Sequence, residues 1–398
     1  MDGVRIDATV RAELLCCFAA ALLLCFITPG LPLFDLCVYW KASAQLVGGE
    51  NPYNLPADVS YMTDIPAQLH EATLTLKSRI WGPPIVFAPI FWIGYLPLQV
   101  VKGLFVLFFY AGACAGWLIA ARLYGGSARN LWVAMYALFI FPVGAWFFAL
   151  SWGSPTWIPM IAILAFLHLY SRERYLASGA VLSVCVLKPH LFLLLFLLVF
   201  LIAVRDKAFG SLIGFGVVAV LLSAVVLLHQ PDAMTMYREF ISVENPYHLV
   251  TASLPNVLSA FFVTPQLWLL YGPLLLAAVC LAFRVLHGGV GEMQIAVPLI
   301  LPFSLLLSPS TWGHDYIACL PLLLLARRQL LESIAAGDRD LTFRFTFALF
   351  CCALTEKYLG FQPFFTHAFP WVLYGVGLAL LSYTTALSLK RGTRSESS

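Results

Sequence analysis

The feature that most constrains this chain is the exclusion of charge from its long apolar runs. Of its 398 residues, 61% are hydrophobic and only 11% are charged, whereas soluble domains carry about 25% charged residues. A soluble core of this size cannot bury such an excess of apolar side chains, so lipid must solvate much of the chain. We therefore expect an all-α polytopic membrane protein that forms a single integral-membrane domain, 1–398.

Helices that cross a bilayer need about 20 mostly apolar residues. The sequence predicts about twelve such helices, and the short ones fit spans shielded by neighbours or broken beside a polar cavity. The segments are Glu13–Phe34, Lys102–Leu123, Leu131–Leu150, Pro155–Tyr170, Leu176–Leu187, Leu191–Val204, Phe209–Leu228, Gln266–Leu286, Ile295–Leu307, Tyr316–Ala326, Phe343–Tyr358 and Pro370–Leu389. The apolar stretch Pro83–Pro97 is shorter, and we expect it to dip into the membrane and return, or to lie along the outer face.

Positive charges orient these segments, because short cytoplasmic loops are enriched in Lys and Arg. Arginines and lysines cluster in alternate connections, namely Arg122 with Arg129, Arg172 with Arg174, Arg205 with Lys207, Arg284 alone, a loop flanked by Arg327, Arg328, Arg339 and Arg344, and the tail 390–398. With these in the cytoplasm, both termini are cytoplasmic and the first span is retained rather than cleaved. The external loops are then 35–82, 151–154, 188–190, 230–265, 308–315 and 360–369.

The sequence excludes several classes of function. No Gly-rich nucleotide loop occurs, so a nucleotide-sugar site is not expected. Nine of the ten cysteines fall in apolar runs without a Cys-x-x-Cys pair, which is typical of packing residues; Cys37 is the one beside a candidate site. No metal motif is present, so we expect no cofactor, although acids of the outer loops could hold a divalent ion weakly. The net charge of +3 is concentrated in a few short loops, so no nucleic-acid partner is expected.

Asp35 is the most informative residue, since it stands where the first predicted span meets water. Val38, Tyr39, Ala42 and Leu46 follow at helical spacing, which predicts an amphipathic helix on the membrane surface that ends at Gly48-Gly49. Asp35 is either a catalytic base at the outer surface or the N-cap of this helix.

Two further external clusters are candidate sites. Lys188-Pro189-His190 interrupts an apolar run, so Lys188 either reaches to the interface or holds an anion. The stretch 308–316 joins two short spans, and there His314 either binds a phosphate or hydrogen-bonds Asp315. Ser253, Asn256 and Ser259 line the same cavity or form a solvated helix start. The two Asn-Pro-Tyr sequences, at 51–53 and 245–247, are interpreted as turns whose match is coincidental.

The motif Phe34-Asp35-Leu36-x-Val38-Tyr39-Trp40-x-Ala42, followed by Gly49-x-Asn51-Pro52-Tyr53 and Pro83-Pro84, resembles the signature of glycosyltransferase family 87. These proteins are multi-spanning GT-C transferases, long described as a domain of unknown function, DUF2029. They include polyprenol-phosphate-mannose-dependent α-1,2-mannosyltransferases. The resemblance covers Phe34 to about Ala326. Two departures are Trp81-Gly82 before the double proline, and Trp152-Gly153-Ser154-Pro155 where the family has a Gly-Gln-Asn-like element.

The resemblance implies a GT-C fold with a large first external loop, and a hexosyltransferase. A hexose, with mannose as the family's usual sugar, would move with inversion from a polyprenyl-phosphate donor to an envelope glycolipid or glycan. Asp35 would take the acceptor proton, and Lys188, His190 or His314 would stabilise the leaving phosphate. The other substrate-binding candidates are Tyr39, Asn51, Tyr53, Lys77, Arg79, Asn256 and Asp315; for Lys77 and Arg79 the alternative is surface solvation.

Localisation in the inner (plasma) membrane follows, with the site on the external or periplasmic face. The main alternative function is a lipid-linked sugar flippase or small-solute transporter. A transporter should carry charges at the middle of its spans or paired broken helices, whereas the charges of this sequence avoid the centres of the predicted spans. A polysaccharide polymerase is a further alternative, but it should lack the Asp35 motif.

Overall fold

Helices account for every regular element that the structure describes. The structure is a computed structural model that describes residues 33–54, 83–124, 149–150, 153–243, 253–255, 267–287, 292–308, 311, 313–348 and 376–386. Within these ranges no strand occurs, so the predicted all-α class is confirmed for the described chain. Nearly all of the predicted first span, most of 131–150 and the tail 390–398 lie outside them.

The long apolar runs form helices close to their predicted bounds. These are α4 (Leu98–Tyr124), α7 (Trp157–Tyr170), α8 (Tyr175–Leu182), α9 (Leu193–Arg205), α10 (Phe209–His229), α13 (Leu267–Leu286), α14 (Met293–Leu306) and α15 (Leu320–Ala335), with further helices at 339–348 and Val376–Ala386. The end of α15 was predicted too early. Arg327 and Arg328 lie inside this helix rather than beside a loop, and Arg328 pairs with Glu332 one turn later at 2.8 Å.

One described helix, α10, is long and apolar enough to cross a membrane by length and composition. In the other helices the apolar segments that meet this description are shorter, at 10–17 residues, for example Leu98–Gly112 in α4 and Tyr271–Leu286 in α13. The predicted number of about twelve crossings therefore stays a prediction, and so does the placement of the bundle in a bilayer.

Small residues bring α8 and α10 into close contact. A Cβ atom on Gly179 would lie 1.8 Å from the carbonyl oxygen of Ser211, and one on Gly214 would lie 2.0 Å from that of Leu176. The hydroxyls of Ser178 and Ser211 meet at 3.1 Å in the same contact. Only residues without a large side chain permit this approach, which is a common way for helices to pack inside membranes.

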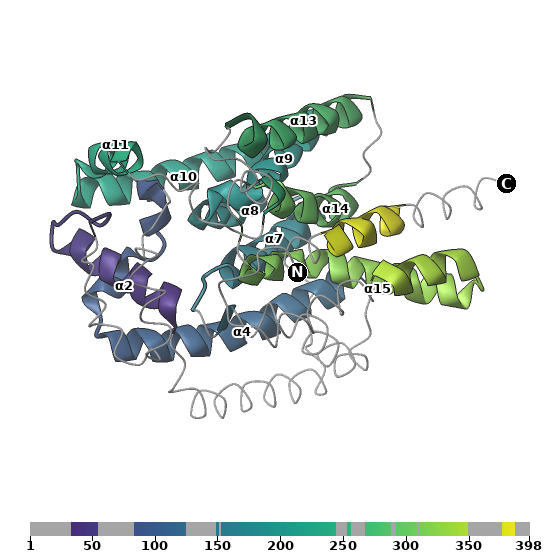
Figure 1. Ribbon diagram of the computed structural model, residues 1–398, viewed down its shortest axis with the longest axis horizontal. Helices are drawn as coiled ribbons and strands as arrows, with labels where there is room; N and C mark the ends of the chain where they lie inside the picture. Colours follow the sequence, from purple (N-terminus) through teal and green to yellow (C-terminus); the bar gives the residue numbers. More distant parts are fainter. Residues whose placement is uncertain are drawn as a thin grey trace.

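A group of short helices lies at one end of the bundle. It comprises α2 (Phe34–Val47), the 3₁₀ helices η1 (Pro84–Phe87) and η2 (Phe91–Tyr95), and α11 (Ala233–Val243). In Figure 1, α2 and α11 lie at one end of the long axis and α15 extends toward the other. Pro83–Pro97 thus forms two short helices rather than one span. Gly94 packs directly on the backbone of Ser43, and Trp40 Nε1 donates to the carbonyl of Leu96 at 2.9 Å.

The helix predicted after Asp35 ends as expected. Gly49 is left-handed at φ 75°, the N–H of Glu50 donates to the carbonyl of Gln45 at 2.8 Å, and the N–H of Gly49 donates to that of Leu46 at 3.2 Å. This pattern is the Schellman motif, for which glycine at the left-handed position is preferred. The predicted stop at Gly48-Gly49 is confirmed.

Candidate functional site

Asp35 occupies the first turn of α2. The N-cap of this helix is Leu33, a buried leucine in the left-handed region at φ 44° and ψ 47°, and no side chain caps the helix. The alternative prediction that Asp35 is the N-cap is therefore wrong, because the helix begins at Phe34, two residues earlier than that role requires. The half-buried carboxylate still benefits from its position, since the N-terminal end of a helix favours negative charge.

Gly153 brings a second segment onto the start of α2. Its φ is 69°, and a Cβ atom there would lie 2.7 Å from Leu36 Cβ and 3.1 Å from the backbone of Leu33. Both the backbone conformation and the missing space require glycine at this position. The contact places the residues after Gly153 beside the turn that carries Asp35.

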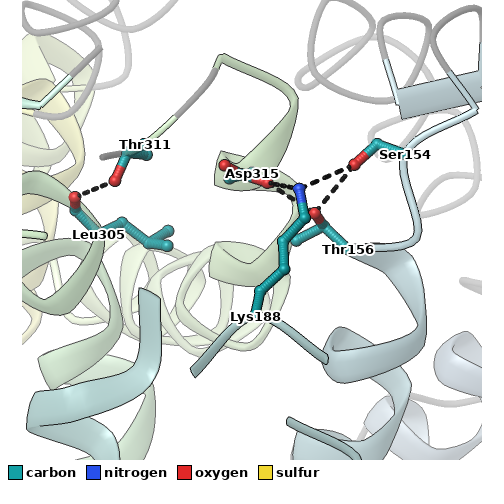
Figure 2. Close-up of polar contacts among 6 residues, drawn as sticks. All are labelled: Ser154, Thr156, Lys188, Leu305, Thr311 and Asp315. Atoms are coloured by element: carbon teal, nitrogen blue, oxygen red, sulfur yellow. Dashed lines mark hydrogen bonds and ion pairs between the residues drawn. The ribbon is translucent and has the colours of Figure 1, made fainter. Parts of the chain in front are cut away.

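Four buried polar residues converge next to this segment (Figure 2). Lys188 Nζ lies 2.8 Å from Asp315 Oδ1 and donates to Ser154 Oγ at 3.2 Å. Thr156 Oγ1 donates to the same Asp315 oxygen at 2.6 Å, and it lies 3.0 Å from Ser154 Oγ. The side chains of Lys188 and Asp315 are 8% and 0% exposed. Their contacts join residues that are 127 positions apart in the sequence.

One helix break and two helix starts position these groups. Lys188 is the single residue between η4 (Ser183–Leu187) and η5 (Pro189–Phe192), where Pro189 starts the second turn and the chain changes direction. Asp315 lies in the first turn of η7 (Gly313–Cys319), which leads into α15. Thr156 immediately precedes α7. Beyond α14, Thr311 Oγ1 donates to the carbonyl of Leu305 at 2.6 Å (Figure 2).

Asp35 and Tyr39 of α2 lie within electrostatic reach of this cluster. Burial disfavours the charged form of Lys188, but the carboxylate of Asp315, with Tyr39 and Asp35, outweighs it and raises the pKa of Lys188. Burial, together with the charges of Asp35 and Asp315 and against that of Lys188, raises the pKa of Tyr39 to about 12. Tyr39 is therefore a neutral hydroxyl and Lys188 a cation at neutral pH.

The charges of Lys188 and Asp315 also act on the pKa of His190. Burial is the main cause that lowers its pKa to about 4; the charge of Asp315 opposes this shift, and that of Lys188 adds to it. A histidine with this pKa is neutral near pH 7, so it can offer a neutral N–H but not a positive charge.

Asn51 and Tyr53, which were predicted as substrate contacts, make contacts within the described chain, and their role in binding stays a prediction. Asn51 Oδ1 accepts the N–H of Tyr53 at 2.9 Å, which is an Asx turn. The ring of Tyr53 stacks on Phe240 and contacts Phe87 and Tyr237, with centroids 5.4–5.7 Å apart. These contacts join the turn after α2 to η1 and α11.

The remaining candidates are not placed. Lys77, Arg79 and Asn256 lie outside the described residues, and the side chain of His314 is not described, although its backbone belongs to η7. Within the described ranges, no group of three or more His, Cys, Asp or Glu side chains could hold a metal ion.

Sequence reasoning missed Ser154 and Thr156 as members of the site. Ser154 was predicted in the external connection 151–154 and Thr156 in the span Pro155–Tyr170. A serine and a threonine at such a boundary are ordinary at helix starts. The one available signal was the resemblance, which puts a cavity-lining element at Trp152-Gly153-Ser154-Pro155.

Chemically, the site combines a carboxylate, a neutral phenol and a buried ammonium. Lys188 gives two of its three N–H donors to Ser154 and Asp315, and no third acceptor is found among the described residues. Such a site can accept a proton at Asp35 and bind an anion at Lys188.

Comparison with known proteins finds no matching family model, no similar curated protein and no similar solved structure.

Proposed function

We propose that this chain is a polytopic membrane glycosyltransferase that moves a hexose from a polyprenyl-phosphate donor to an envelope glycolipid or glycan. The observation that carries the proposal is the meeting of Lys188 and Asp315 within electrostatic reach of Asp35 and Tyr39. It unites a candidate base and a candidate anion-binding cation from segments far apart in the sequence. The resemblance to GT-C glycosyltransferases of family 87 supports the same assignment.

Apolar side chains on the outside of the bundle support a membrane location. A soluble monomer rarely exposes contiguous apolar patches larger than a few hundred Å². Here large hydrophobic side chains are exposed along both α10 and α13, namely Phe209, Ile213, Val217, Val220, Leu221, Leu227 and Leu228, and Trp268, Tyr271, Leu275, Leu276, Val279, Phe283 and Leu286. We assign these surfaces to lipid, in the plasma membrane.

In the proposed reaction, Asp35 takes the proton of an acceptor hydroxyl while that oxygen attacks the anomeric carbon. The new C–O bond forms as the bond to the phosphate oxygen breaks on the opposite face, so the configuration inverts. The lipid phosphate leaves with the negative charge, which the ammonium of Lys188 stabilises. Tyr39 remains neutral and can donate its O–H to either substrate. Mannose is the sugar that the resemblance favours.

One observation favours a second candidate, a flippase for lipid-linked sugars. A helix broken beside a buried ion pair, as at Lys188, is a feature of transporters. A flippase would move a labelled lipid-linked sugar across proteoliposome membranes without cleaving it, whereas a transferase consumes it.

The test is incubation of the purified full-length protein, in lipid nanodiscs, with a panel of polyprenyl-phosphate sugars. We expect consumption of one donor, with release of polyprenyl phosphate that depends on an added glycan or glycolipid acceptor. Consumption of no donor in the panel, together with sugar translocation in proteoliposomes, would replace the transferase by the flippase.

A further inference from the structure

The hydrogen bonds around Lys188 form a closed ring with a defined donor order. Thr156 has one O–H, which it gives to Asp315, so the contact between the two hydroxyls must use the O–H of Ser154. Ser154 in turn accepts from Lys188. The order therefore runs from Lys188 through Ser154 and Thr156 to the carboxylate of Asp315, and the ion pair closes the ring.

The members of this ring differ in burial and in how many of their hydrogen-bond donors are used. Asp315 has a side chain that is 0% exposed, and Ser154 and Thr156 are likewise 0% exposed. Lys188 is the ring member whose donors are not all used among the described residues, and it lies within electrostatic reach of Asp35 and Tyr39 on α2. A ligand that reaches this ring from α2 would therefore meet the ammonium rather than the carboxylate.

We propose that Asp315 and Thr156 are positioning residues, which keep the ammonium of Lys188 charged and fixed toward the anionic phosphate of the donor. The inference rests on the proposed function. It changes the predicted role of Asp315, which then holds the ammonium of Lys188 rather than the substrate. Thr156 acts one step further away, because its O–H holds the oxygen of Asp315 that Lys188 contacts.

Removal of the Asp315 charge should change how donor turnover and phosphate binding depend on pH. Burial alone lowers the pKa of a lysine, and the nearby carboxylate reverses this for Lys188. Among the described residues, the other titratable groups that interact with the ammonium are Asp35 and Tyr39 from α2 and His190 from η5. Tyr39 and His190 are neutral near pH 7, so Asp315→Asn removes the carboxylate that opposes the effect of burial, and the ammonium loses its proton at lower pH than in the wild type.

The experiment compares Asp315→Asn, Thr156→Val and Thr156→Ser in the full-length protein. Two readouts are followed against pH: kcat/KM for the polyprenyl-phosphate sugar that the wild type consumes, and the thermal stabilisation given by a polyprenyl monophosphate. Thr311→Val is the matched control, since it removes a buried hydroxyl that donates to the Leu305 carbonyl and lies outside the ring.

We expect the alkaline limb of both profiles to move to lower pH in Asp315→Asn. Thr156→Val keeps the ion pair and should lose roughly tenfold in kcat/KM, as expected for loss of a hydrogen bond to a charged group. Thr156→Ser should restore the wild-type value, and Thr311→Val should leave the shape of the profile unchanged.

Wild-type turnover with unchanged profiles in Asp315→Asn and Thr156→Val overturns the inference and leaves the proposed function standing. If no donor sugar is consumed but phosphate binding shifts with pH as expected, the positioning role stands and the transferase is rejected. Absence of both turnover and phosphate binding in the wild type rejects both.

Discussion

Lys188 and Asp315 form an ion pair, 2.8 Å between Nζ and Oδ1, where the break between η4 and η5 meets the first turn of η7. Both side chains are buried, so neither charge is compensated by bulk water. Removing one partner of a buried pair leaves an uncompensated charge, whereas replacing both by apolar groups removes the problem. The pair therefore has separate consequences for stability and for function.

The first prediction concerns stability. Lys188→Met should destabilise the fold by about 3–5 kcal/mol, because Asp315 is left buried without its cation. The double variant Lys188→Met/Asp315→Leu should recover most of this loss. Thermal unfolding of the purified variants in detergent measures both effects. A double variant no more stable than Lys188→Met would mean that the ion pair is not the cause.

A second prediction tests the close contact between α8 and α10. Gly214→Ala should destabilise the protein by about 1–3 kcal/mol, as overpacking does, because its Cβ would overlap the carbonyl of Leu176. Gly216→Ala is a control in the same helix, since nothing lies within 4 Å of its Cβ. The fraction that stays monodisperse on size-exclusion chromatography after heating gives the measurement. Equal behaviour of the two variants would contradict the packing.

The third prediction concerns topology. Single cysteines in place of Glu50 and Arg172, in a background without native cysteines, both stand at exposed positions. A membrane-impermeant maleimide added to intact cells should label position 50, after α2, and not position 172, between α7 and α8. Labelling at position 172 with protection of position 50 would reverse the proposed orientation.

The helices were predictable because long apolar runs and their breaks are local properties of the sequence. Pro189 indicated the break at Lys188, and Gly48-Gly49 indicated the end of α2, since both residue types restrict or permit particular backbone angles. The cap assigned to Asp35 was wrong because Leu33 adopts a left-handed conformation that no sequence pattern predicts for leucine.

Part of the site was also predictable. The external clusters at Lys188 and Asp315 were expected on one face, and the structure brings these two residues into contact. The hydrogen bonds of Ser154 and Thr156 could not be predicted from the local sequence, because their partners Lys188 and Asp315 are 34 and 159 positions away. Asn51 and Tyr53 follow the motif closely, yet their described contacts hold a turn and an aromatic cluster.

The most direct test of the proposed chemistry is donor consumption by Asp35→Asn, measured beside wild type and Glu50→Gln with the donor and acceptor that the wild type uses. Glu50 is an exposed carboxylate shortly after the same helix, which makes it a matched control. Loss of a general base should lower turnover by about 10²–10⁴-fold. Donor binding and the Glu50→Gln variant should remain near wild type. Full turnover by Asp35→Asn would contradict the assignment of Asp35 as the base.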